Sequence, residues 1–219
     1  FFIFAVFSPF KKSANPGIVD DVFNKLDTYL SENLGSVSIN IDATKVISSC
    51  FSIPEINDMD CDVGKLIVKD VAGVSMNSNF DGPNIKIEYI SGSGDTFYTI
   101  YCSDDIANTH ILTSTSCTSL TQGTDYSLGI INTRQIWSES KITQLETDYN
   151  SNKYNDVKDN FVSEANDFGV VISEPTDEEV FVIKKDAPTT SEVFAKSFPV
   201  QTFNSDAEIE QRKALVVFW

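Results

Sequence analysis

Basic and imidazole side chains are scarce in this chain. It carries 16 lysines and arginines against 32 aspartates and glutamates, which gives a formal net charge of −16 at pH 7. A field of that sign repels phosphate backbones, and two arginines, Arg134 and Arg212, supply little bidentate phosphate recognition. The composition therefore predicts that nucleic acid is not a partner.

The single histidine, His110, limits the catalytic chemistry that the sequence offers. It follows Asp104 and Asp105 and has many hydroxyl neighbours, so a Ser-His-Asp arrangement is one hypothesis. The sequence has no Gly-x-Ser-x-Gly elbow, however, and scattered hydroxyls around one histidine are ordinary in proteins that are not enzymes. We expect no catalytic residues and no enzymatic activity, and a secreted hydrolase is only the third hypothesis.

The four cysteines include no Cys-x-x-Cys pair, and with one histidine they cannot complete a usual zinc set. They form two local pairs in the sequence, Cys50 with Cys61 and Cys102 with Cys117. Four cysteines allow three disulfide connectivities, of which we expect the two adjacent pairings. The alternative is four buried free thiols. The even count, the apolar start and the surface rich in Asn, Ser and Thr favour an exported protein.

One acidic cluster is a candidate for a metal site. Asp58, Asp60 and Asp62 have the alternate spacing that lets three carboxylates fold onto one hard cation. An EF-hand loop that began at Asp58 would need glycine at its sixth position and glutamate at its twelfth, where this chain has Val63 and Lys69. We therefore expect a solvated acidic turn first, with a loose Ca²⁺ site as the alternative, and no other cofactor.

The apolar run that opens the chain is shorter than the ~20 residues that span a bilayer. Burying each phenylalanine side chain contributes roughly 1.5–3 kcal/mol, so something must cover this segment. We call residues 1–12 the leader and expect like subunits or membrane lipid to contact it. Its interface residues are Phe1, Phe2, Ile3, Phe4, Val6, Phe7 and Phe10.

Three interpretations of the leader stay open. It is the end of a longer membrane-anchoring helix, stopped by Pro9 and with Lys11 and Lys12 at the lipid headgroups. Alternatively, it is a strand donated to a groove of a neighbouring subunit. The third interpretation is an ordinary first strand of the core.

The segment after the leader predicts an amphipathic helix. Asn15 is a suitable N-cap and Pro16 a suitable first helical residue. Apolar residues then recur at helical spacing from Ile18 to Leu30, and Gly35 is placed to end the helix.

Residues 36–137 show the pattern of short strands. Apolar and polar residues alternate, and turn-forming sequences such as Asp81-Gly82-Pro83 separate the runs. We expect these strands around residues 37–41, 46–47, 66–68, 85–89, 96–102 and 128–131.

Two helical stretches follow near 139–165, with a break at 150–152. Strands then return around 170–172, 180–183, 198–203 and 215–219, and Pro199 limits its strand to an edge or a strand start. The predicted fold is α+β: an N-terminal amphipathic helix leads into a mainly antiparallel sheet or sandwich, with the helical pair inserted. We expect residues 13–219 to form a single domain, with a possible split near 138.

The last third of the chain carries a further pattern. Its segments are Asp148-Tyr149, Lys153–Lys158 (KYNDVK), Asn166–Ile172 (NDFGVVI), Phe198–Phe203 (FPVQTF), an acidic turn, and Leu215–Trp219 (LVVFW). This pattern resembles the downstream half of archaeal membrane-anchored surface proteins of the pilin-like or pseudopilin-like type. The resemblance implies an N-terminal transmembrane helix and an extracellular β-rich head, and it brings no catalytic residues.

The sequence therefore favours a non-enzymatic structural protein of the cell surface, a pilin-like or filament subunit with an exported acidic head. A membrane-anchored extracellular binding or adhesion module is the alternative. We expect an extracellular or cell-surface location, with like subunits or lipid as partners.

Overall fold

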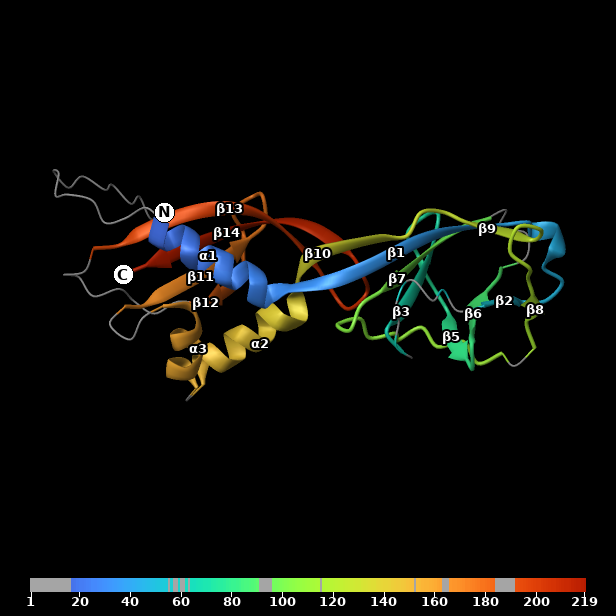
Figure 1. The fold of residues 1–219 in the computed structure, drawn as a ribbon, viewed down its shortest axis with the longest axis horizontal. Coiled ribbons are helices and arrows are strands. Elements are labelled where there is room, and N and C mark those ends of the chain that lie inside the picture. Colours follow the sequence, from blue (N-terminus) through green and yellow to red (C-terminus); the bar gives the residue numbers. More distant parts are fainter. Residues whose placement is uncertain are drawn as a thin grey trace.

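The computed structural model describes residues 17–54, 56, 59, 62, 64–90, 96–114, 116–151, 153–162, 166–183 and 192–219. These residues form an elongated molecule with two lobes in line (Figure 1). We call the lobe that contains the start of α1 and the end of the chain the proximal lobe, and the other the distal lobe.

The proximal lobe has helices packed on one face of an antiparallel sheet. The strands lie in the order β12-β11-β14-β13, and buried apolar residues of the sheet and the helices form one cluster between them. The elements are α1 (Gly17–Leu30), α2 (Glu139–Asn150), α3 (Tyr154–Phe161), β11 (Phe168–Ser173), β12 (Glu179–Ile183), β13 (Phe194–Phe203) and β14 (Ile209–Phe218).

Helix α1 confirms the predicted amphipathic helix but ends earlier than expected. Its buried residues are Val19, Val22, Leu26 and Leu30, at the spacing of one helical face. The expectation that Gly35 ends the helix is wrong, because strand β1 (Ser31–Ile41) begins directly after Leu30 and contains Gly35. The side chain of Lys141 donates to the Ser31 carbonyl at 2.8 Å and pairs with Glu32, which fixes the start of β1 against α2.

The distal lobe consists of two sheets with an apolar cluster between them. One sheet contains β1 and the other has the order β5-β6-β2-β8. The remaining elements of this lobe are η1 (Ala43–Lys45), β2 (Cys50–Pro54), β3 (Leu66–Asp70), β4 (Ser75–Met76), β5 (Ser78–Asp81), β6 (Asn84–Glu88), β7 (Phe97–Cys102), β8 (Thr118–Ser119) and β9 (Tyr126–Leu128).

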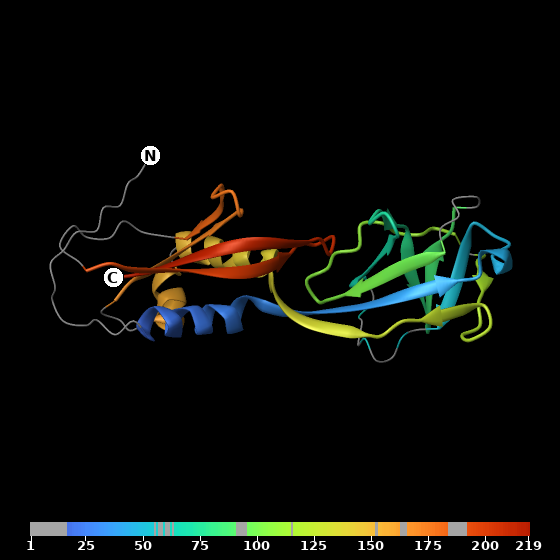
Figure 2. The same cartoon turned by 90° about the horizontal axis from the view of Figure 1, so that it is seen from above.

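Two long strands join the lobes. β1 runs from the proximal lobe into the distal lobe, and β10 (Asn132–Ser138) returns antiparallel to it (Figure 2). Because β10 also pairs with β13, one ten-stranded sheet runs through both lobes in the order β12-β11-β14-β13-β10-β1-β7-β3-β4, with β9 paired to β1. Residues 42–131 are thus an insertion between β1 and β10.

A third apolar cluster, which we call the junction cluster, lies where the lobes meet. Ile67 and Ile106 come from the distal lobe, whereas Phe203 and Ala207 come from the end of β13 and the following turn. Leu34 of β1 and Ile136 of β10 complete the buried set. Figure 2 shows the tip of the β13–β14 hairpin reaching the distal lobe, where the amide of Ala107 donates to the Ser205 carbonyl.

The α+β class, the leading helix and the helical pair after residue 138 are confirmed. The described sheets are mixed, since β10 with β13 and β2 with β8 pair in parallel while the other described strand pairings are antiparallel. The expected strand at 46–47 is wrong. These residues follow the short helix η1, which Asp42 caps, and Ile47 is 89% exposed. Pro199 lies in a part of β13 that pairs with β14 alone, as expected for an edge position.

The junction cluster predicts that the lobes unfold together. Phe203 is 1% exposed, so we expect Phe203→Ala to lower the free energy of unfolding by about 3–5 kcal/mol through the cavity it leaves. The change should also speed proteolytic cleavage of the β1–β10 connection. Chemical denaturation and limited proteolysis measure both effects.

Phe97→Ala is the control, because Phe97 is 52% exposed and its truncation should cost less than about 1 kcal/mol. Equal losses in the two variants would contradict the coupling role of the junction cluster.

Candidate functional site

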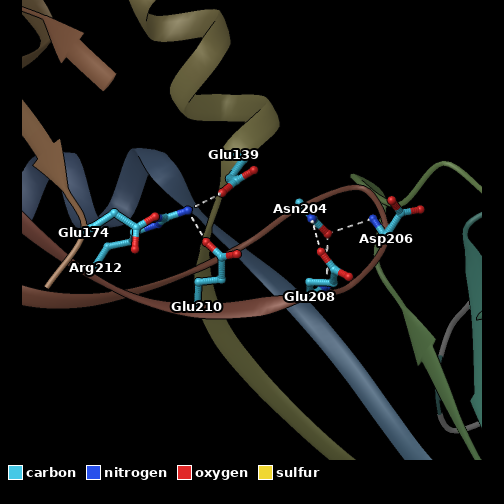
Figure 3. A network of polar contacts seen from close by, with 7 residues as sticks. All are labelled: Glu139, Glu174, Asn204, Asp206, Glu208, Glu210 and Arg212. Atoms are coloured by element: carbon cyan, nitrogen blue, oxygen red, sulfur yellow. Dashed lines mark hydrogen bonds and ion pairs between the residues drawn. The ribbon is translucent and has the colours of Figure 1, made fainter. Parts of the chain in front are cut away.

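Arg212 is the centre of a polar network beside the junction cluster. Its side chain is 7% exposed, and it ion-pairs with Glu174, Glu210 and, at 3.7 Å, Glu139 (Figure 3). The residues come from separate elements: Glu139 begins α2, Glu174 follows β11, and Glu210 and Arg212 lie on β14. The network therefore holds three parts of the proximal lobe around one buried cation.

A second set of polar contacts lies in the turn between β13 and β14. The Asn204 side-chain oxygen accepts hydrogen bonds from the amides of Asp206 and Glu208, and its nitrogen donates to the Glu208 carboxylate at 2.9 Å (Figure 3). Ala207 adopts a left-handed conformation with φ 54° in this turn and is buried in the junction cluster. The polar contacts thus fix the turn that reaches the distal lobe.

Carboxylates outnumber cations here, and the pKa values reflect this. Burial raises the pKa of Glu139, and the charges of Glu210 and Glu208 raise it further against the opposing effect of Arg212. Burial by itself lowers the pKa of Arg212, but the hydrogen bond to Glu174 and the charges of Glu210 and Glu174 outweigh it and raise the pKa. The arginine thus stays charged, and the pKa of Glu139 lies above its usual value.

The arrangement supports a structural role. A guanidinium held by carboxylates provides neither a nucleophile nor an electron-pair acceptor for a reaction. Within the described part of the chain, no group of three or more His, Cys, Asp or Glu residues is arranged to hold a metal ion. The network fixes the hairpin and α2 relative to each other.

The second face of the proximal sheet, which we call the open face, points away from the helices. Side chains of the sheet alternate, and those of Val170, Ile172, Ala214 and Val216 belong to the cluster under the helices. The intervening positions therefore lie on the open face. They include Gly169, Val171, Val182, Ala195, Ser197, Leu215 and Val217, and none of these is charged.

The disulfide pattern differs from the expected one. Cys50 bonds to Cys117, so the adjacent pairings Cys50–Cys61 and Cys102–Cys117 are wrong. The parallel pairing of β2 with β8 brings the two cysteines together across 67 residues of sequence. Cys102 is also disulfide-bonded, while Cys61 lies outside the described residues. Disulfides are typical of oxidising, non-cytoplasmic compartments, which agrees with an exported protein.

Most of the other predicted site residues lie outside the described part of the chain. The leader interface residues, Asp58 and Asp60 lie outside the described residues, and Asp62 is exposed. At His110, the backbone amide donates to the Asn108 side chain and the carbonyl accepts from Ser78. No hydrogen bond joins its imidazole to a described hydroxyl or carboxylate, so no Ser-His-Asp arrangement is assembled among the described residues.

Sequence reasoning missed the Arg212 network and the open face. The scarcity of arginine was a usable signal for the network, because one of the two arginines in the chain, Arg212, is buried. The unbroken apolar run from Ala214 to Phe218 was a signal for the open face, because it places apolar residues on both faces of β14.

No family model matches this chain, and no curated protein or solved structure matches it significantly. None of the helices in the described part of the chain has both the length and the apolar content to cross a membrane.

The excess of acid around Arg212 predicts opposite effects for two matched substitutions. The folded pKa of Glu139 is raised, so the folded chain holds that proton above the unfolded pKa and loses stability as the pH rises through the folded pKa. Glu139→Gln should therefore raise the free energy of unfolding at pH 7, with the gain disappearing near pH ~4.

Glu210→Gln is the comparison, because it removes a hydrogen-bonded partner of the buried guanidinium. We expect it to lower the free energy of unfolding at pH 7 by about 1 kcal/mol, after allowing for the partial exposure of Glu210. Denaturant titrations across the pH range compare the two. A loss of stability in both variants at pH 7 would show that the network is not over-supplied with acid.

The disulfide of the distal lobe gives a further prediction. Its closed loop spans 67 residues, so replacing Cys50 and Cys117 together by serine should cost about 4 kcal/mol in the chain-entropy model. Peptide mapping without reduction should recover Cys50 linked to Cys117. Recovery of Cys50 linked to Cys61 would refute this connectivity.

Proposed function

We propose that this chain is a non-enzymatic structural protein of the cell surface, whose leader joins it to like subunits or to membrane lipid. The observation that carries the proposal is that the two ends of the elongated molecule differ. α1 begins and β14 ends at the tip of the proximal lobe, and the disulfide-bonded distal lobe is at the opposite end (Figure 1). A subunit attached through its leader would present the distal lobe away from the attachment.

The joined construction of the lobes supports a load-bearing role. β1 and β10 cross between the lobes as a continuous antiparallel pair, and the junction cluster and the Arg212 network brace the crossing. An extracellular location agrees with the Cys50–Cys117 disulfide in the distal lobe and with the net charge of −16.

We propose further that the protein is of the archaeal pilin-like type. The segments that carry the resemblance fall in the proximal lobe, on α2, α3, β11, β13 and β14. In a filament of such subunits, contacts would repeat from head to tail, with the leader as part of each interface. The distal lobe would then lie outside the filament axis.

A binding or adhesion module is the second candidate, and the distal lobe carries the observation that favours it. Phe97 is 52% exposed and Val71 is 71% exposed at neighbouring ends of β7 and β3. Near the far tip, a hollow of about 290 Å³ is lined by residues that include Asp42, Asp125 and Ser127. Exposed apolar groups beside a polar hollow fit contact with a partner surface.

Removal of residues 1–10 tests the proposed function. Because the described fold begins at Gly17, the shortened chain should keep its melting temperature. The intact chain should self-associate or float with liposomes, and the shortened chain should sediment as a monomer and stay in solution. Sedimentation velocity and liposome flotation measure the two properties.

The proposal fails if the intact chain is a monodisperse monomer that does not float with liposomes. A marked fall in melting temperature on removal of the leader would show instead that the leader belongs to the core of its own chain.

A further inference from the structure

We propose that the open face of the proximal sheet is the seat for the leader of a second copy of this chain. The proposal deepens the proposed function and depends on it, since it names the surface that receives the leader. It commits to one occupant, residues 1–10 of a neighbouring copy, and places the subunit contact at the proximal lobe.

The composition of the open face is the first argument. The protein is 22% charged, yet the seven open-face positions named above hold only apolar and small residues. They cover the proximal part of β11, β12, β13 and β14, while the ion pair of Lys213 with Asp177 marks the border toward the junction. An uncharged sheet face of this kind is typical of a surface that another apolar layer covers.

The described residues leave the outer strands of the open face exposed, although Val171 and Gly169 on β11 are buried. Ala195 and Ser197 are exposed, Val193 is 49% exposed and Val180 is 40% exposed. A helix layer already covers the other face of the same sheet. The open side of β13 therefore has room for a segment from a second copy.

The leader fits this surface in chemistry, in length and in position. Its first seven residues are all apolar, so in an extended conformation both of its sides need cover, which an interface between two copies provides. Ten extended residues span at most about 33–36 Å, comparable with the ten-residue strands β13 and β14. The leader joins α1 at the proximal tip, where Asp20 pairs with Lys196 of β13 beside Ala195.

A hollow at the border of the open face offers a place for aromatic rings. Pro175, Ser197, Pro199 and Lys213 line part of it, and its volume is about 420 Å³. Shallow apolar hollows of this size accept ring-sized groups, and the leader supplies phenylalanines at five of its first ten positions.

The sheet edges are poorer acceptors than the face, which argues against strand addition. On β12, the amide of Val182 donates to the side chain of Glu146, and a register shift interrupts the pairing of β12 with β11. On β13, the edge carries Lys196 and Pro199, and both residue types discourage an added strand. The leader is therefore expected to pack across the face.

The test compares substitutions in the full chain. Ala195→Glu places a charge on the open face at an exposed position where folding is not at risk, and Val217→Glu does so at the half-buried neighbouring position on β14. We expect each to weaken self-association by about tenfold or more, because the charge would be buried without a partner. Ala72→Glu is the matched control: it makes the same exchange at an exposed turn of the distal lobe and should change nothing.

Phe4→Glu in the leader separates failure of this inference from failure of the proposed function. Sedimentation velocity over a concentration series gives the association constants, and thermal melts confirm that each variant is folded. If Phe4→Glu weakens association and both open-face variants leave it unchanged, the open face is not the seat, although the leader still joins subunits.

If the full chain is monomeric and floats with liposomes, the inference is overturned and the lipid-anchored form of the proposed function stands. If Phe4→Glu changes neither association nor flotation, the proposed function fails as well. Weakened association in Ala195→Glu, Val217→Glu and Phe4→Glu, with Ala72→Glu unchanged, is the result that we expect.

Discussion

The structure depends on the place where the two lobes meet. Leu30, Leu34 and Val37 lie within eight residues on one continuous stretch of chain, yet they belong to the proximal, junction and distal clusters respectively. The continuous segment of α1 and β1 therefore contributes to all three apolar clusters, with α1 in the proximal one and β1 in the other two. Because interiors are close-packed and respond to small changes in volume, a shift of β1 would disturb both lobes at once.

The Arg212 network restricts the orientation of the hairpin, whereas the apolar contacts contribute stabilising free energy. Burial of Ile106, Phe203 and Ala207 favours contact between the lobes but does not by itself fix the angle of the hairpin. The guanidinium restricts it, because it pairs with Glu174 after β11 and with Glu139 at the start of α2 while it stays buried. Burial, and after it the neighbouring charges of Glu210 and Glu208, raise the pKa of Glu139 at this site.

The sequence predicted what local patterns determine. The apolar spacing of Val22, Leu26 and Leu30 in α1 and of Val157 and Phe161 in α3 marks helices, because each helix buries a face of its own. Where the outcome depended on distant partners, prediction failed. The helix stops short of Gly35 because Ser31 pairs with Trp137, and Cys50 reaches Cys117 because β2 and β8 are neighbours. The Arg212 network likewise joins residues from separate segments, so no local sequence pattern predicts it.

The insertion of the distal lobe also explains why the two faces of the proximal sheet differ. The chain leaves the proximal lobe through β1 and returns through β10, directly before α2, so both α1 and the helical pair meet the sheet on the face that Trp137 joins. The described residues after α3 form strands and their connections, and they bring no described helix to the opposite face. The connectivity of the described chain thus leaves the uncharged face of β11, β13 and β14 without a helical layer. Because α1 begins at the same tip, the apolar residues that precede it in the sequence are joined to the chain near this face, which is why we propose the subunit interface there.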